Sequence, residues 1–213
     1  KTTTAGMLTT RVIPTSGKAF VGGIDVVEHS TAAKQVIGVV PQSNTLDRSL
    51  NVWENLYFHG RYFGMSSRAA HQRTTELLEQ FRLGDRAKAD TITLSGGMAQ
   101  RVGIARALLQ NPAVILMDEP FGALDAMTRQ TLQDEVARLC QESGVTVVFI
   151  THDLEEAIYL GDRVLAMTKG PGRIGATLDV DLPRPRHQLT TREDAQFLQY
   201  RHELFHSLPN EGH

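Results

Sequence analysis

The sequence has little cysteine and no excess of one charge. Its single cysteine, Cys140, can form neither an internal disulfide nor a cysteine-based zinc site, and this usage fits a reducing compartment such as the cytosol. The formal net charge is −2, from 22 basic and 24 acidic side chains, and no basic stripe is visible. Nucleic acid is therefore not an expected partner, because a protein that binds it through charge needs such a stripe.

Long apolar runs are absent as well. No stretch approaches the ~20 consecutive apolar residues of a membrane-spanning helix, and no secretory signal is visible. We therefore expect any role at a membrane to depend on a partner protein that spans it.

What the sequence does contain is an alternation of short β-branched runs and amphipathic stretches. The runs predict buried strands of a parallel sheet at 36–40, 113–117, 145–150 and 163–167. Apolar residues at helical spacing predict helices at 68–82, 97–110 and 126–142. This alternation predicts an α/β fold.

Two segments depart from this alternation. Residues 8–27 carry three glycines among short alternating pieces and predict an antiparallel hairpin region. Residues 170–187 are rich in Gly, Pro and Arg and predict an irregular extension, followed by an amphipathic helix at 192–207. His202 and His206 have the spacing of metal ligands on that helix, but no third ligand is evident.

Two acids, Asp118 and Glu119, directly follow the run at 113–117. Open α/β sheets bind their ligands at the carboxyl ends of the strands, where this pair would stand. Asp118 could hold Mg²⁺, and Glu119 could polarise a water that attacks a phosphate. The alternative interpretation is a solvated acidic turn.

Other polar residues stand at the ends of predicted elements. The Ser-Gly-Gly at 95–97 opens a helix, whose backbone N–H groups and positive end favour a phosphate; an ordinary serine N-cap is the alternative. His152 follows the run at 145–150, so it could reach the same phosphate as Asp118 if the two strands are neighbours. Asp153 and Glu156 predict a capping box for the next helix.

In their order along the chain, these segments resemble the nucleotide-binding domain of ABC transporters. The likeness rests on the end of a Walker A motif at 1–2, a Q-loop at Gln42, a signature motif at 94–98, a Walker B motif at 114–119, a D-loop at 122–125 and a switch histidine at 152.

The resemblance covers residues 1 to about 170. It implies a P-loop NTPase (RecA-like) core with an antiparallel β subdomain and a helical subdomain at about 45–105, and leaves 171–213 as a C-terminal extension. The family's Walker A glycines, and the strand before them, precede the position of Lys1. We therefore expect that strand and most of the phosphate loop to be missing from this chain.

The resemblance also assigns roles around the nucleotide. Lys1 would contact the β- and γ-phosphates of ATP, and Thr3 would touch the α-phosphate region. Thr2, Gln42 and Asp118 would hold Mg²⁺.

Further roles concern hydrolysis and dimerisation. Glu119 would act as the general base, and His152 would contact the γ-phosphate. Ser95, Gly96 and Gly97 would bind the ATP held by a second copy in a head-to-tail dimer, with Asp125 along the interface. Met98 stands where the family commonly has glutamine; the backbone N–H groups at 95–97 remain, so we expect activity to survive.

Two sets of residues near these motifs have an ordinary alternative. Apolar side chains after Gln42 suit a groove for a helix of a membrane partner, or they simply pack the helical subdomain; they are Leu46, Leu50, Trp53, Leu56, Tyr57 and Phe58. Arg101 and Arg106 follow the signature, and surface salt bridges are their simplest explanation.

A transporter ATPase of this family implies partners: transmembrane permease subunits, a second nucleotide-binding subunit and, for an importer, a solute-binding protein. It would work at the cytoplasmic face of the membrane. Residues 36–98 are similar to drug-export ABC ATPases, whereas the sequence from Val102 onward is similar to the importers of nitrate, sulfonate and taurine. The longer C-terminal likeness favours import. A drug-export ATPase, a soluble non-transport ABC ATPase and a non-catalytic nucleotide-binding module are the alternatives.

Overall fold

The computed structural model describes residues 1–168, 170 and 172–207. The chain forms two compact units: the N-terminal unit is Thr2–Val148, and the C-terminal unit consists of Lys1 and the residues from Phe149 onward. The division predicted from the sequence, with a nucleotide-binding domain up to about residue 170 and an extension at 171–213, stays a prediction. Among the described residues, no helix combines the length and the apolar character needed to cross a membrane.

A three-stranded sheet in the order β3-β4-β5 forms the centre of the N-terminal unit. Its strands are β3 (Ile37–Val40), β4 (Val114–Asp118) and β5 (Thr146–Ile150), the last of which ends in the C-terminal unit. β3 and β4 run parallel, with Ile37 opposite Val114 and Val40 opposite Met117. The strands predicted at 36–40, 113–117 and 145–150 are confirmed, although Val36 ends a helix instead of starting β3.

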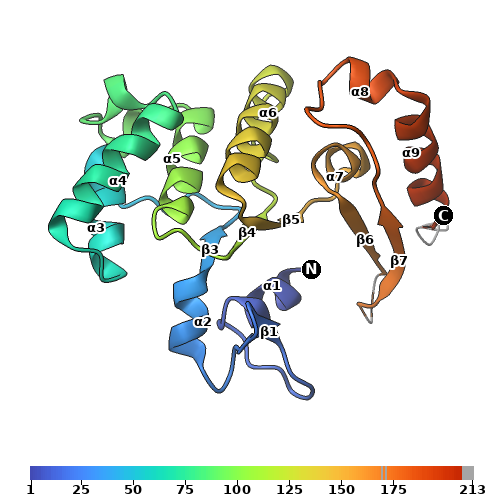
Figure 1. The fold of residues 1–213 in the computed structure, drawn as a ribbon, viewed down its shortest axis with the longest axis horizontal. Coiled ribbons are helices and arrows are strands. Elements are labelled where there is room, and N and C mark those ends of the chain that lie inside the picture. Colours follow the sequence, from blue (N-terminus) through green and yellow to red (C-terminus); the bar gives the residue numbers. More distant parts are fainter. Residues whose placement is uncertain (169, 171, 208–213) are drawn as a thin grey trace. The chain divides into compact units, whose positions relative to one another are not determined.

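Three helices form the helical part of this unit, drawn in cyan to light green in Figure 1. They are α3 (Val52–Tyr62), α4 (Ser67–Gln80) and α5 (Gly96–Leu108), with 3₁₀ turns η1 (Gly84–Arg86) and η2 (Thr91–Thr93) between the last two. Leu56, Leu77 and Ile104 are almost fully buried between the helices, as helical spacing of apolar residues predicts. The helices predicted at 68–82 and 97–110 are confirmed.

The apolar residues after Gln42 mostly pack this helical part. Leu46 and Leu56 are buried, whereas Phe58 is half exposed and stacks edge-on against Tyr57. The packing alternative is therefore correct for the two leucines.

A short hairpin joins β1 (Phe20–Val21) to β2 (Ile24–Asp25), with α1 (Thr2–Leu8) before it and α2 (Ser30–Val36) after it. Gly22 and Gly23 make its turn with φ of 58° and 78°. Only glycine adopts this left-handed backbone without a steric penalty. The predicted hairpin region is confirmed for residues 20–25, and residues 9–19 lie outside the strands.

The helix α6 (Ala126–Ser143) confirms the prediction at 126–142. Its stripe of Leu132, Val136 and Leu139 is buried, and Gly144 ends it in the left-handed conformation. Cys140 is buried on the same helix, and this burial raises the pKa of its thiol to about 11. The thiol is therefore protonated at neutral pH and has little nucleophilic character.

The C-terminal unit contains α7 (Leu154–Leu160), β6 (Arg163–Met167), β7 (Ile174–Asp179), α8 (Thr190–Glu193) and α9 (Ala195–Ser207). A shared core joins α7, β6, β7 and α9, and its buried members include Ile158, Tyr159, Ala166, Leu178, Phe197 and Leu204.

Two predictions for this unit are wrong. The run at 163–167 is a strand, but it pairs antiparallel with β7 and is only partly buried, so it does not belong to a parallel sheet covered on both faces. β7 itself lies inside the segment predicted to be irregular. Pro171 of the predicted extension lies outside the described residues. The final helix is confirmed from residue 195 rather than 192.

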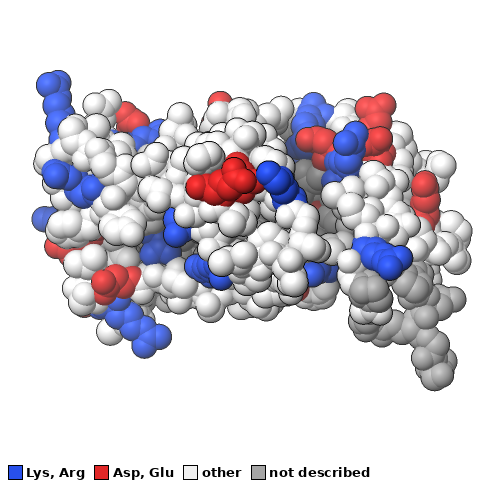
Figure 2. Space-filling model, turned by 90° about the horizontal axis from the view of Figure 1, so that it is seen from below, with Lys and Arg blue, Asp and Glu red and all other residues white. Residues whose placement is uncertain are grey.

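Charged side chains are mixed on the face shown in Figure 2. Within the part of that face that the structure describes, lysine and arginine alternate with aspartate and glutamate instead of gathering into one basic stripe. This mixture agrees with the near-balanced charge of the sequence.

Candidate nucleotide site

The end of β4 carries the acid pair. Asp118 is the last residue of the strand, and Glu119 follows it with a φ of 45°. This left-handed backbone costs a residue with a Cβ atom about 1–2 kcal/mol, and such strain concentrates at functional sites. The N–H of Gly122 donates to the Glu119 carbonyl oxygen at 3.2 Å, and the fully buried Phe121 anchors the turn. The chain thus holds Glu119 in a fixed, strained turn at the edge of the sheet.

Gln42 lies at the same edge of the sheet. The pairing of Val40 with Met117 sets the ends of β3 and β4 level, so Gln42 leaves β3 where Asp118 and Glu119 leave β4. Gln42 is exposed. The structure therefore brings these three predicted residues to one edge.

Oxygen donors suited to Mg²⁺ occur in this unit. Magnesium prefers carboxylate, amide and hydroxyl oxygens, which Asp118, Gln42 and Thr2 provide. Thr2 and Thr3 are exposed in the first turn of α1, and that helix packs against β4. The donor set thus fits the metal that accompanies a nucleotide.

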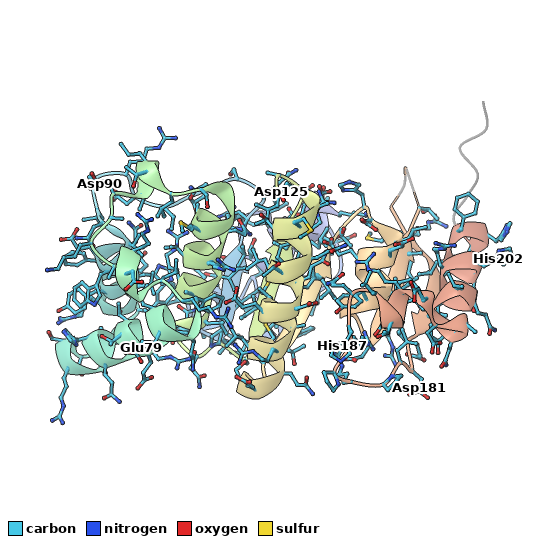
Figure 3. The ribbon with its side chains drawn as sticks, turned by 90° about the horizontal axis from the view of Figure 1, so that it is seen from above. Glu79, Asp90, Asp125, Asp181, His187 and His202 are labelled. Atoms are coloured by element: carbon cyan, nitrogen blue, oxygen red, sulfur yellow. The ribbon has the colours of Figure 1, made fainter. Side chains whose placement is uncertain are left out.

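A metal site made of histidine, cysteine or acids alone is not found. Among the described residues, no three such side chains are grouped as metal ligands. The rings of His202 and His206 lie 4.2 Å apart on α9, and Figure 3 shows His202 at the outer side of that helix. This pair has the predicted spacing, and no ligand group of three forms around it within the described chain.

Ser95 begins α5 as its N-cap. Its side-chain oxygen accepts a hydrogen bond from the Met98 N–H at 3.3 Å, so the ordinary capping role is present. Ser95 and Gly96 are exposed. The first N–H groups of a helix have no partner within the helix, and its positive end attracts anions. Ser95 and Gly96 thus leave an exposed helix start without bulky side chains, which suits a phosphate, whereas Gly97 is buried and the Met98 N–H already donates to Ser95.

The start of α6 lies against the start of α5. A Cβ atom added to Gly97 would lie 2.6 Å from Cγ2 of Thr128, and one added to Gly96 would lie 3.5 Å from Cδ2 of Leu124. Asp125 caps α6 by accepting a hydrogen bond from the Thr128 N–H at 3.0 Å, and Figure 3 shows it at the end of that helix. This hydrogen bond lowers the pKa of the Asp125 carboxyl below its ordinary value. The signature segment and the D-loop segment therefore form one surface.

His152 belongs to the C-terminal unit, where it is exposed between β5 and α7. Asp153 caps α7, accepting hydrogen bonds from the N–H groups of Glu155 and Glu156 at 2.9 and 3.1 Å, which confirms its half of the predicted capping box. The ammonium group of Lys1 donates to the Thr151 carbonyl oxygen at 2.6 Å, so this cation lies beside the residue that precedes His152. A joint site of these residues with Asp118 and Glu119 stays a prediction.

The contact of Arg106 with Thr45 and the contact of Gly97 with Thr128 could not be predicted from the sequence. Arg106 donates to the carbonyl oxygen and the hydroxyl of Thr45, at 2.9 and 2.6 Å, so a surface salt bridge does not explain it. Arg101 does form an ion pair, with Glu135 of α6 at 2.7 Å. Thr128 completes the contact with Gly97, and no pattern around it in the sequence marks that role.

Comparison with known proteins extends these observations. A protein-family model described as ABC transporter matches residues 1–122. The chain is similar to nitrate transport protein NasD of Klebsiella oxytoca, with 49% identity over 132 residues, 62% of this chain and 50% of that protein. It is also similar to taurine import ATP-binding protein TauB of Rhizobium johnstonii, with 44% identity over 147 residues, 69% of this chain and 56% of that protein. The chain thus spans about half the length of these curated relatives.

A solved structure has the same fold. It is a dimeric ATP-binding cassette, MJ0796, in a post-hydrolysis state bound to ADP and Pi. The TM-score is 0.73 at 29% identity, covering 85% of this chain and 81% of that one. The predicted P-loop NTPase fold class is confirmed. Since the family model matches more than half of the sequence and the fold is that of an ATP-binding cassette, this chain belongs to the ABC transporter family.

Proposed function

We propose that the protein is the ATP-hydrolysing subunit of an ABC transporter. The observation that carries this proposal is the turn after β4, where the strained Glu119 follows Asp118 at the sheet edge that Gln42 also reaches. Membership of the family supports the same reaction.

In this proposal, Glu119 accepts a proton from the water that attacks the γ-phosphate of ATP, and Gln42 orients that water. The bond between the γ-phosphorus and the bridging oxygen breaks, so ADP leaves and inorganic phosphate remains. Thr2, Gln42 and Asp118 hold Mg²⁺. Bound Mg²⁺ would supply neutralisation of the charge on the phosphate oxygens. Lys1 exchanges its hydrogen bond to Thr151 for one to the β- and γ-phosphates, with Thr3 near the α-phosphate.

His152 completes the site by a contact with the γ-phosphate. The remaining contacts come from a second copy of the chain, placed head to tail. Its Ser95, Gly96 and Gly97 present the start of α5 to the same phosphate, and Asp125 lines the interface. The contact between the starts of α5 and α6 supports this arrangement, because the signature segment and the D-loop segment would then face the second copy together. The solved MJ0796 cassette is itself dimeric.

We also propose that this dimer drives import of a solute of the nitrate, sulfonate or taurine type. The names of NasD and TauB support this class over drug export. The partners would be transmembrane permease subunits and a solute-binding protein, with the dimer bound at the cytoplasmic face of the membrane. Co-purification with a membrane-embedded partner separates this function from that of a soluble ABC ATPase.

Replacement of Glu119 tests the reaction. In the full-length protein with its permease, Glu119→Gln should lower the rate of ATP hydrolysis at least about 100-fold, because the amide cannot accept the proton. ATP binding should persist, since the amide has the same shape. Glu142→Gln is the matched control, because Glu142 is exposed and pairs only with Arg138 of the same helix among the ion pairs of the described residues. Hydrolysis by Glu119→Gln at the wild-type rate would reject the proposal.

A further inference from the structure

The helix that follows His152 is held at its first turn by two arginines from the end of the chain. Glu155 of α7 accepts a hydrogen bond from Arg192 of α8 on one carboxylate oxygen, at 2.8 Å. Arg201 of α9 donates to the other oxygen at 3.0 Å. One carboxylate thus ties α7 to two helices of the C-terminal extension.

The last turn of α7 is held by the same extension. Arg186, whose side chain is 3% exposed, donates to the carbonyl oxygens of Ile158, Tyr159 and Gly161 at 3.1, 2.9 and 2.8 Å. The last carbonyl groups of a helix lack partners within the helix, and a cation is favourable at that end. Arg186 therefore caps α7 from outside.

Apolar packing completes the attachment. Tyr159 is buried in the core that includes Phe197 and Leu204 of α9, and its hydroxyl donates to the Arg186 carbonyl oxygen at 3.0 Å. The Arg192 guanidinium lies 5.1 Å from the centre of the Tyr159 ring. α7 is therefore attached to α8 and α9 by packing as well as by polar contacts.

The contact of Glu155 with Arg201 is poorly placed to serve stability alone, although the Arg192 side chain is only 22% exposed. The side chains of Glu155 and Arg201 are 37% and 49% exposed, and ion pairs this open to solvent stabilise a fold little. Their geometry is nevertheless specific, because each carboxylate oxygen has its own arginine. Orientation of the first turn of α7 is the role that fits such contacts best.

We propose that Arg192 and Arg201 are positioning residues that set the place of His152. They fix Glu155, which together with Glu156 donates its backbone N–H to Asp153, the residue after His152. The C-terminal extension thereby controls the histidine that contacts the γ-phosphate. This inference rests on the proposed ATPase function.

The test uses the double variant Arg192→Gln/Arg201→Gln in the full-length protein with its permease. We expect kcat for ATP hydrolysis to fall roughly five-fold, a coupling typical of contacting groups, with KM for MgATP changed less than about two-fold. Amide hydrogen exchange at Glu155 and Glu156 should accelerate without nucleotide. The lysine pair Arg192→Lys/Arg201→Lys should restore most of the rate. Arg163→Gln is the control, because it breaks an exposed ion pair with Asp179 in the same unit.

A His152→Ala background separates positioning from a purely structural role. If the arginines act through His152, the double variant lowers kcat no further in that background. An equal fall with and without His152, or unchanged exchange at Glu155 and Glu156, would overturn the inference. Unchanged hydrolysis by Glu119→Gln would instead overturn the proposed function, and the exchange measurement would still judge the contact between the arginines and α7.

Discussion

Gly97 and Thr128 approach so closely that a Cβ atom on Gly97 would stand 2.6 Å from the methyl carbon of Thr128. Side chains do not tolerate such a distance, so the starts of α5 and α6 can touch only because residue 97 is glycine. The signature segment and the D-loop segment owe their common surface to this contact.

Gly97→Ala should therefore separate the two helix starts. We expect the free energy of unfolding to fall by about 1–3 kcal/mol, as for other overpacked contacts, measured by urea unfolding. Thr128→Ser removes the obstructing methyl group and should recover most of the loss. Gly103→Ala on the same helix has no atom near its new Cβ and should be neutral or stabilising by up to ~1 kcal/mol. A Gly97→Ala variant as stable as the wild type would contradict the contact.

His59 of α3 should make stability depend on pH. Burial lowers its pKa from 6.5 to about 4, with a smaller contribution from the charge of Arg106. Between pH 6.5 and 4, the imidazole is protonated in the unfolded chain but neutral in the folded chain. The free energy of unfolding is therefore highest above pH 6.5 and falls as the pH decreases toward 4. The loss approaches roughly 3 kcal/mol. Urea unfolding of the wild type and His59→Gln between pH 7 and 4 measures it, and a difference that does not change with pH would exclude this titration.

Arg106 should hold the segment that follows Gln42. It is the donor to both oxygens of Thr45, and Arg106→Met removes these hydrogen bonds while keeping the apolar stem. We expect a loss of about 1–3 kcal/mol in unfolding free energy and faster amide exchange at residues 43–47. Arg138→Met serves as the comparison, because Arg138 pairs with Glu142 on the exposed side of α6. Equal rates of amide exchange at residues 43–47 in the two variants would show that Arg106 does not hold this segment.

Local patterns in the sequence predicted most elements, because buried runs and helical stripes are encoded by neighbouring residues. These patterns failed where the direction and burial of a strand depend on the segment with which it pairs. The run at 163–167 has strand composition, but its composition cannot reveal that it pairs antiparallel with β7. β7 was missed because glycines before it and Gly175 within it conceal the alternation of a strand.

The candidate site shows the same division. Asp118, Gln42 and Ser95 stand at element ends that the sequence marks, so their placement could be predicted. The strained φ of Glu119 could not, because it depends on how Phe121 and the rest of the turn pack. The contacts of Arg106 and Arg186 could not be predicted either, because a backbone carbonyl group accepts a hydrogen bond from any donor side chain that the fold brings near.

Mixing two inactive variants tests the central claim that two copies share each ATP. Ser95→Arg should block the helix start offered to the partner, and Glu119→Gln should disable the base. Each variant alone is expected to be inactive. In a head-to-tail dimer of the two, one site combines the intact Glu119 of one copy with the intact Ser95 of the other, so the mixture should regain roughly a quarter of the wild-type ATPase rate. A mixture as inactive as its components would contradict the shared site.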